Sequence, residues 1–265
     1  MPLTHGPQER AGFLDMQAEV GITKHPGGYP ATDELLALCH IDTASRVLNV
    51  GCGIGVASTY LARKFGCRVV AIDRSPQMVS WSQQRAWEEG VAGHIDLVVA
   101  DLLAMPFASD QFDIVFCESV LNFVGDKPRA IDECKRVTVP GGYVGINEMF
   151  WLSEAISAFE GQVSAILGTQ QALLTKSGWQ ALWEASGLAE ETAHIHPVDV
   201  SREVRDRIHW VGWRWIVRAW GRALRLYGTK PAVRNAIKEQ FRFPIDVMSN
   251  MGYGVFVGRK PLSTF

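Results

Sequence analysis

The sequence predicts an α/β protein with a parallel sheet, and two patterns carry that prediction. From residue 46 onward, short apolar runs alternate with segments of helix length, which is typical of βαβ units whose strands are buried on both faces. Three glycines at alternate positions, Gly51, Gly53 and Gly55, join the first apolar run to a helical one. Such glycines let the backbone approach a bound group closely, and the following helix turns its free N–H groups toward that group.

The first half of the chain gives the clearest elements. A turn-rich hinge, His25–Pro30, precedes a helix at 32–39 with Thr32 or Asp33 near its cap. Apolar runs then predict strands at 46–50, 68–73, 95–100, 112–117 and 142–148. Helical spacing predicts helices at 55–65, 76–90 and 127–137. The turn Pro140-Gly141-Gly142 introduces the fifth strand.

The pattern changes after residue 150. Helices are expected between 150 and 187, and the one at 174–186 ends at Gly187, a common C-terminal residue for a helix. A strand at about 190–198 and a long helical segment at about 201–242 follow. A glycine-rich apolar run beginning at Met251 predicts a last strand.

Composition limits the class of protein. The 265 residues are 47% apolar with a formal net charge of -2, so the charge balance does not favour a nucleic-acid partner. Five irregularly spaced cysteines favour reduced thiols. No signal-peptide pattern and no apolar run of membrane-spanning length stand out, so we expect a cytoplasmic protein without stable membrane insertion. The oligomeric state is left open.

Two carboxylates follow the second and third strands. Asp73 closes the run Cys67–Asp73, and Asp101 closes Leu97–Asp101. Because ligands of open parallel sheets bind at the carboxyl ends of the strands, these acids and the glycine turn should form one nucleotide-like site. Taken alone, Asp73 could cap the next helix and Asp101 could be a turn residue.

The glycine spacing separates the candidate cofactors. A dinucleotide motif would place its third glycine at position 56, where this chain has Val56. No Lys-Ser/Thr pair follows, which excludes a phosphate-binding P-loop.

These segments resemble the class I S-adenosylmethionine-dependent methyltransferases, and among them the small-molecule, ubiquinone/menaquinone-type group. The resemblance is carried by Val47–Gly55, Asp73–Met78, Ala100–Phe107, Gln111–Phe123 and Arg136–Tyr143, in the expected order. It implies S-adenosylmethionine as cofactor and a Rossmann-like, seven-stranded, mostly parallel sheet with an antiparallel last strand and helical lid insertions. The expected cofactor-binding residues are Asn49, Gly51, Cys52, Gly53, Gly55, Asp73, Arg74, Met78, Asp101, Leu102 and Glu118.

One position departs from the family pattern. Asn49 stands where the family usually has an acid that holds the methionine amino group. An amide oxygen accepts a hydrogen bond but carries no charge, so we expect Asn49→Asp to tighten cofactor binding.

Methyl transfer is an in-line displacement, so the protein mainly aligns the reactants and excludes water. Glu118 and Tyr29 are the candidate catalytic residues. The expected substrate pocket comprises His25, Tyr29, Asn122, Glu148, Trp151 and Trp213. No spacing typical of a metal site appears, and His194 and His196, two apart on a strand, are interpreted as a surface pair.

The insertions at 149–173 and 199–250 should form a lid, because both leave the sheet at its cofactor edge. Trp210, Trp213, Val217, Trp220 and Leu224 share one helical stripe, and five arginines between 207 and 225 form another. Three interpretations stay open: tryptophans packed on the core, a pocket for a hydrophobic, aromatic, anionic or amine acceptor, or a basic amphipathic helix on an anionic membrane.

The expected organisation has four parts. Residues 1–45 form a cap segment and first helix, 46–148 the cofactor-binding core, 149–250 the lid insertions, and 251–265 the last strand. The expected function is methyl transfer from S-adenosylmethionine to a small-molecule acceptor in a lid-covered pocket. The alternatives are a non-catalytic S-adenosylmethionine sensor and a nicotinamide-dependent oxidoreductase.

Overall fold

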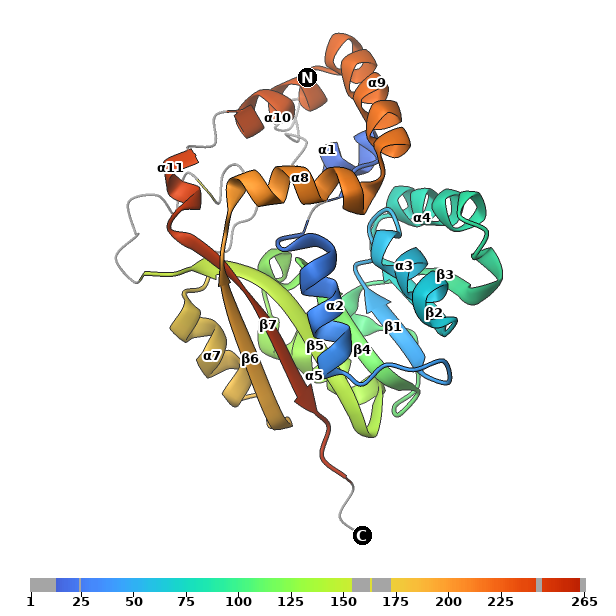
Figure 1. Cartoon of the computed structure of the whole chain (residues 1–265), viewed down its shortest axis with the longest axis vertical. Helices are drawn as coiled ribbons and strands as arrows, with labels where there is room; N and C mark the ends of the chain where they lie inside the picture. Colours follow the sequence, from blue (N-terminus) through green and yellow to red (C-terminus); the bar gives the residue numbers. More distant parts are fainter. Residues whose placement is uncertain (1–12, 24, 154–162, 164–172, 242–244, 263–265) are drawn as a thin grey trace, which may run out of the picture.

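The computed structural model describes residues 13–23, 25–153, 163, 173–241 and 245–262, and a seven-stranded sheet forms its centre (Figure 1). The strands are β1 (Arg46–Val50), β2 (Arg68–Asp73), β3 (Ile95–Val99), β4 (Phe112–Glu118), β5 (Thr138–Trp151), β6 (Ala189–Pro197) and β7 (Met251–Arg259). Their order is β3-β2-β1-β4-β5-β7-β6. Strand β7 is antiparallel to both neighbours, and the other pairings are parallel. The predicted sheet is confirmed.

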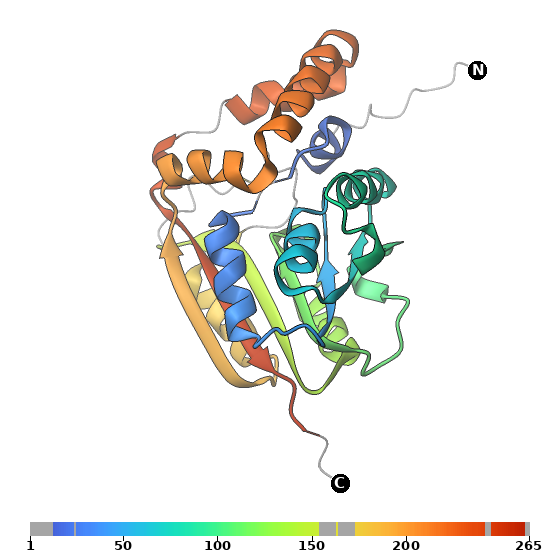
Figure 2. The same ribbon diagram turned by 45° about the vertical axis from the view of Figure 1, so that its right-hand side comes forward.

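Helices cover both faces of the sheet. The α-helices in the described part of the chain are α1 (Phe13–Val20), α2 (Gly28–Leu38), α3 (Val56–Phe65), α4 (Pro76–Glu88), α5 (Lys127–Val137), α7 (Lys176–Glu184), α8 (Val200–Val211), α9 (Trp213–Thr229), α10 (Pro231–Phe241) and α11 (Ile245–Met248), and only some of them lie on the faces of the sheet. On one face, Val47 and Val69 pack with Leu35 of α2 and Leu61 of α3. On the other face, Leu48 belongs to the cluster built around α5 and α7. Because side chains alternate along β1, they contribute to two core layers, one on each face of the sheet. Figure 2 shows the helices on the two sides of the sheet.

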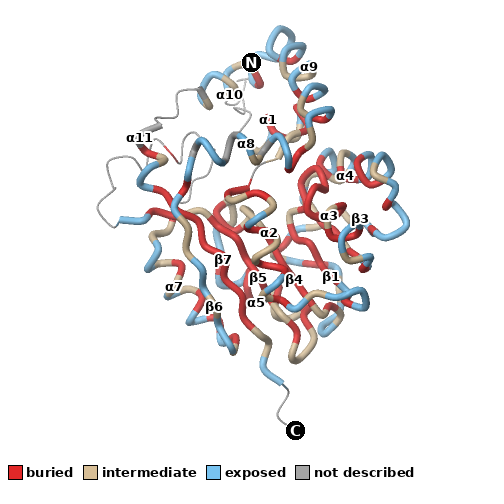
Figure 3. The backbone as a smooth tube through the Cα atoms, in the orientation of Figure 1, coloured by how far each residue is buried: buried red, intermediate tan, exposed pale blue. Residues whose placement is uncertain are grey.

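A third group of helices lies beyond the carboxyl ends of the parallel strands. Helix α8 crosses above this edge, with α1, α9 and α10 farther out (Figures 1 and 2). The chain enters this group after β6 and returns to the sheet at β7, as the expected topology requires. These outer helices expose more of their surface than the sheet does (Figure 3).

The long helical segment expected at 201–242 is in fact three helices. Gly212 separates α8 from α9 with φ 87, a conformation that side chains with a Cβ rarely adopt. Pro231 then begins α10, since proline is tolerated in the first helical turn but not in a helix interior. The helices expected between 150 and 173 lie largely outside the described residues.

The turn expected at 140–142 is an irregularity within β5. Phe112 of β4 pairs with Thr138, but Ile114 pairs with Tyr143, so the pairing register shifts at this point. Gly141 accommodates the bend with φ 81.

The histidine pair of β6 is a surface pair, and it shares a carboxylate. Nδ1 of His194 lies 2.6 Å and Nε2 of His196 lies 2.8 Å from the two oxygens of Glu34 on α2. Both rings are partly exposed. Their contact joins β6 to α2 and lies outside the cavity described below.

Candidate active site

The glycine turn between β1 and α3 is tightly packed. Gly51, Gly53 and Gly55 have φ of 72, 53 and 79. A Cβ at Gly51 would lie 2.3 Å from Val120, and one at Gly55 would lie 2.3 Å from the hydroxyl of Ser82. The turn therefore requires glycine for its conformation and for the close approach of its neighbours.

Asp73 is bound to this turn. Its Oδ2 accepts a hydrogen bond from the backbone N–H of Gly53 at 3.0 Å, and its Oδ1 accepts one from Ser75 at 2.9 Å. Burial raises the pKa of Asp73, and these donors partly offset that effect. Each carboxylate oxygen keeps a second lone pair. Asp73 can therefore still accept hydrogen bonds from a neighbouring diol.

Asp101 stabilises the turn after β3, which is the role that its side chain was expected to have if taken alone. Its Oδ1 accepts a hydrogen bond from the N–H of Leu103 at 2.8 Å. The side chain remains exposed and lines the same cavity as Asp73.

A cavity of about 1020 Å³ extends from this edge of the sheet to the outer helices. One end is lined by Gly51, Gly53, Asp73, Arg74, Ser75, Met78, Asp101 and Leu102. The other end is mainly apolar and is lined by Phe13, Met16, Val20, Ile22, Phe123, Met149, Val163, Leu173, Ile208, Ile216, Trp220, Ile237 and Met248. Glu118, Ser119, Val120 and Asn122 also contribute to the wall. The cavity thus combines a polar end with a larger apolar chamber.

Glu118 is held at the cavity wall by α2 and is flanked there by the hinge that precedes this helix. The hydroxyl of Thr32 lies 2.9 Å and 3.2 Å from its two oxygens. Nδ1 of the buried His25 lies 3.8 Å from Oε1 of Glu118, and Asn147 fixes the hinge by donating to the carbonyl of Pro26 at 2.9 Å. These contacts fix the carboxylate in place.

Glu148 is a buried structural acid. Its Oε1 accepts hydrogen bonds from the backbone N–H groups of Val120 and Leu121, both at 2.7 Å. Burial raises the pKa of Glu148 to about 7, although these donors favour the ionised form. Glu148 therefore shapes the wall at 119–121, where Ser119 has φ 57, without lining the cavity itself.

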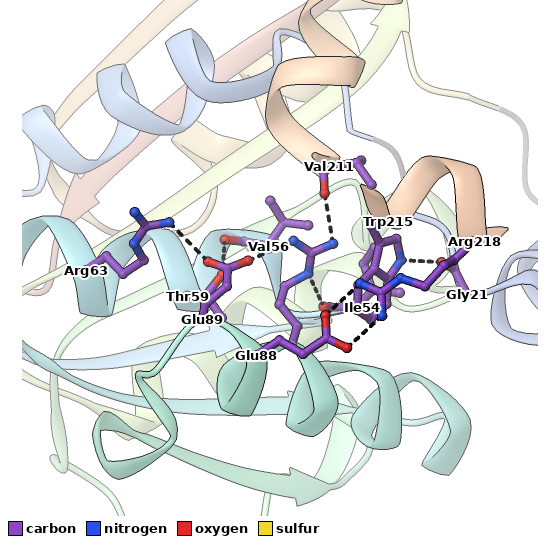
Figure 4. Close-up of polar contacts among 11 residues, drawn as sticks. Gly21, Ile54, Val56, Thr59, Arg63, Glu88, Glu89, Val211, Trp215 and Arg218 are labelled. Atoms are coloured by element: carbon purple, nitrogen blue, oxygen red, sulfur yellow. Dashed lines mark hydrogen bonds and ion pairs between the residues drawn. The ribbon is translucent and has the colours of Figure 1, made fainter. Parts of the chain in front are cut away.

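Arg85 of α4 joins the glycine turn to the outer helices. Figure 4 shows its partners Ile54 and Val211 on the two sides of this contact. Arg85 is 5% exposed, and it donates to the carbonyl of Ile54 and to that of Val211, both at 3.0 Å. Its guanidinium also contacts Glu89 at 2.9 Å and lies 4.3 Å from the ring centre of Trp215. A second bridge joins Glu88 to Arg218 of α9.

The predicted site residues separate into two groups. The cavity is lined by Gly51, Gly53, Asp73, Arg74, Met78, Asp101, Leu102, Glu118 and Asn122. The lining does not include Asn49, Cys52, Gly55, His25, Tyr29, Glu148, Trp151 or Trp213. Gly55 still shapes the turn, and His25 contacts Glu118. The other six residues lie outside the cavity lining, which the sequence did not reveal.

Three of these placements bear on the expected roles. Asn49 is 3% exposed, its amide nitrogen donates to the hydroxyl of Ser58 at 2.8 Å, and it is not among the lining residues, so its contact with the cofactor and the effect of Asn49→Asp stay predictions. The ring of Tyr29 packs at 4.5 Å from that of Tyr60, away from the cavity, and does not support a catalytic role. Trp213 projects from α9 with 64% of its surface exposed.

Trp151 and Cys52 are packing residues. Trp151 is 1% exposed within the core cluster next to α2. Cys52 is also buried, and burial raises the pKa of its thiol. Neither presents a polar group to the cavity lining.

The sequence argument missed α1 and Arg85. Phe13, Met16 and Val20 of α1 line the apolar chamber, and their spacing of three and four was a readable helical signal. Arg85 had no such signal, because its carbonyl partners come from segments distant in sequence.

Residues 48–146 match a family model described as a methyltransferase domain. This segment contains the glycine turn and both Asp73 and Asp101. Residues 48–146 of this chain are therefore similar to a methyltransferase domain. The predicted resemblance to methyltransferases is confirmed over this segment.

Curated relatives share part of the chain. Phosphoethanolamine N-methyltransferase 1 of Arabidopsis thaliana is 32% identical over 122 residues, which is 46% of this chain and 24% of that protein. Tocopherol O-methyltransferase of the same plant is 36% identical over 115 residues, 43% of this chain and 32% of that protein. The match thus spans about a quarter to a third of these enzymes.

Solved structures share the whole fold. The [4+2]-cyclase SpnF has a TM-score of 0.71 at 20% identity, with 95% of this chain and 94% of that chain covered. Phosphoethanolamine N-methyltransferase 2 of Haemonchus contortus, in complex with phosphomonomethylethanolamine and S-adenosylhomocysteine, has a TM-score of 0.67 at 18% identity, with 96% and 59% covered. At such identities the likeness shows the fold.

Two surveys of the described residues complete the site. None of the helices within them is long and apolar enough to cross a membrane. Over the same residues, no group of three or more His, Cys, Asp and Glu side chains is arranged to hold a metal ion.

Proposed function

We propose that the protein transfers the sulfonium methyl of S-adenosylmethionine to a small, largely apolar acceptor held in the outer chamber. The observation that carries the proposal is the continuity of one cavity from Asp73 to the apolar walls of α1 and α9. A shared cavity brings cofactor and acceptor into contact without bulk water, as an in-line displacement requires.

The polar end fits the adenosyl part of the cofactor. Asp73 would accept hydrogen bonds from the ribose hydroxyls with its two spare lone pairs, and Leu102 and Met78 would flank the adenine. Gly53 and Thr23 both line this end, and a Cβ on Gly53 would lie 2.8 Å from the hydroxyl of Thr23, so a side chain at position 53 would displace part of the lining. When bound, S-adenosylmethionine supplies an activated methyl group.

Glu118 is the proposed catalytic residue. It lines the same cavity as Asp73 and the apolar side chains, Thr32 donates to its carboxylate at 2.9 Å, and Nδ1 of His25 lies 3.8 Å away. A carboxylate in this place can accept a proton from an acceptor hydroxyl or amine, and it can balance a positive centre. Asn122, also on the wall, is a proposed acceptor contact.

The fold alone does not determine the reaction, since one protein that shares it is called a cyclase. Methyl transfer is therefore tested directly, with radiolabelled cofactor and a panel of apolar phenols, quinols and amines. Labelled product that requires both acceptor and Glu118 supports the proposal. Tight binding of S-adenosylhomocysteine without turnover on any acceptor would instead favour a sensor.

We further propose that the protein works in a reducing, cytoplasmic environment. All five cysteines are free and buried, a state that such an environment maintains. The chemical identity of the methylated atom, N, O, S or C, is read from the product of the same assay.

A further inference from the structure

Helix α9 carries a row of large apolar side chains on its outer surface. The exposed fractions are 64% for Trp213, 61% for Val217, 58% for Trp220, 70% for Leu224 and 38% for Tyr227. We call these five residues the α9 stripe. Their spacings of four, three, four and three residues place them on one face of the helix.

A different face of α9 anchors the helix to the rest of the protein. Trp215, Ala219 and Leu226 are buried, and the indole N–H of Trp215 donates to the carbonyl of Gly21 at 2.7 Å. Arg222 donates to the carbonyl of Val20, also at 2.7 Å. The α9 stripe is therefore not needed to hold the helix in place.

The charge of α9 has one sign. The helix contains Arg214, Arg218, Arg222 and Arg225 and has no Asp or Glu. Arg218 forms an ion pair with Glu88, and the guanidinium of Arg222 donates hydrogen bonds to the backbone carbonyls of residues 20 and 21. Arg214 and Arg225 are exposed beside the stripe. An apolar row next to positive charge, with tryptophan and tyrosine prominent, is the pattern of helices that lie in the interface of an anionic bilayer.

The stripe also borders the cavity. Trp220 is 58% exposed and lines the cavity, and so does Ile208 of α8, which is 51% exposed. Ile216 and Ala223, on the adjoining face of α9, line it as well. The apolar chamber thus reaches the surface beside the α9 stripe.

We infer that the α9 stripe docks on an anionic lipid bilayer and that the acceptor enters the chamber from the membrane. The docking rests on the charge and exposure of α9, and the acceptor route rests on the proposed function. The stripe would lie among the acyl chains near the headgroups, while Arg214 and Arg225 would contact anionic headgroups.

The test is co-sedimentation of the full chain with phosphatidylcholine vesicles that contain or lack phosphatidylglycerol. The wild-type protein should bind the anionic vesicles, bind the neutral ones far less, and dissociate at high salt. Trp213→Ser/Leu224→Ser should weaken vesicle binding by at least about tenfold. Neither residue lines the cavity, so binding of S-adenosylhomocysteine should not change.

The matched control is Val99→Ser/Leu262→Ser. These side chains are 51% and 70% exposed, lie away from α9 and do not line the cavity. Their replacement should leave vesicle binding unchanged. Equal loss in both double variants would overturn the inference, as would absence of wild-type binding. So would wild-type dimers that dissociate in Trp213→Ser/Leu224→Ser without vesicle binding, because a second copy would then occupy the stripe.

Failure of this inference is distinguishable from failure of the proposed function. Methylation of a detergent-dispersed acceptor without vesicle binding would refute only the membrane docking. Vesicle binding without methylation of any acceptor would refute the proposed function and the acceptor route that rests on it, but not the membrane docking.

Discussion

Arg85→Met should weaken the attachment of the outer helices to the core. Methionine keeps an apolar stem of similar length but removes the donors to Ile54 and Val211, whose carbonyls lie 3.0 Å from the guanidinium. Both carbonyls belong to buried residues, so each would lose its partner in a region with little access to water.

The expected cost follows from these contacts. A buried backbone acceptor left without a partner costs about 1–3 kcal/mol, and the contact with Trp215 contributes further. Relief from burying a charge offsets part of the loss. We expect the free energy of unfolding to fall by about 3 kcal/mol, which corresponds to a lower melting temperature by roughly 6–12 °C for a domain of this size.

The assay is urea unfolding followed by circular dichroism, with Arg63→Met as the matched control. Arg63 also contacts Glu89, at 3.5 Å, but 62% of its side chain is exposed. A surface pair of this kind contributes at most about 1 kcal/mol. If the two variants lose the same stability, Arg85 does not join the layers as argued.

Three further predictions concern the site. Asp73→Ala should raise the Kd for S-adenosylhomocysteine, measured by calorimetry, by at least about tenfold, since a hydrogen bond to a charged acceptor contributes about 1.5–3 kcal/mol. An unchanged Kd would mean that the nucleoside binds elsewhere. Burial raises the pKa of Glu148 to about 7, so the folded state binds the proton more tightly than the unfolded state. Its contribution to stability is then greatest at low pH and is lost as the pH rises toward 7. Glu148→Gln should remove that part of the pH dependence of stability. If the melting temperatures of the wild type and of Glu148→Gln change in parallel between pH 5 and 8, the prediction is contradicted. Gly55→Ala should destabilise the protein more than Gly66→Ala. Both glycines have positive φ, but only at Gly55 would a new Cβ lie 2.3 Å from Ser82. Equal unfolding midpoints for the two variants would argue against the close packing.

The regular sheet was the most predictable part of the molecule. Strands β1, β2 and β4 and helix α5 follow the expected ranges closely, because local periodicity and caps such as Asp126 determine them. The glycine turn and Asp73 could be placed together because carboxyl ends of parallel strands meet at one edge.

The outer helices were less predictable, and Gly212 explains why. The expected stripe from Trp210 to Leu224 assumed one continuous helix, but the break at Gly212 changes the helical phase. Trp210 is buried at 5% exposure, whereas Trp213 and Leu224 point outward. The side of α9 that packs inward includes Trp215 instead. A single backbone angle thus decided which tryptophans became core.

The apolar chamber depends on tertiary contacts that no short window of sequence contains. Phe13 of α1 and Phe123 after β4 are stacked with ring centres 6.5 Å apart, although 110 positions separate them. Tyr29 illustrates the converse. It lies in the expected hinge, but its ring packs on Tyr60 instead of reaching the cavity.

The last strand along the chain, β7, lies between two earlier strands in the sheet, β5 and β6. While residues 251–259 are still being synthesised, the two earlier strands present bare edges in the nascent polypeptide, and such edges can pair with other chains. Final assembly of the sheet must therefore await the last strand, which makes the interval before its release from the ribosome the most aggregation-prone stage in the biogenesis of this protein.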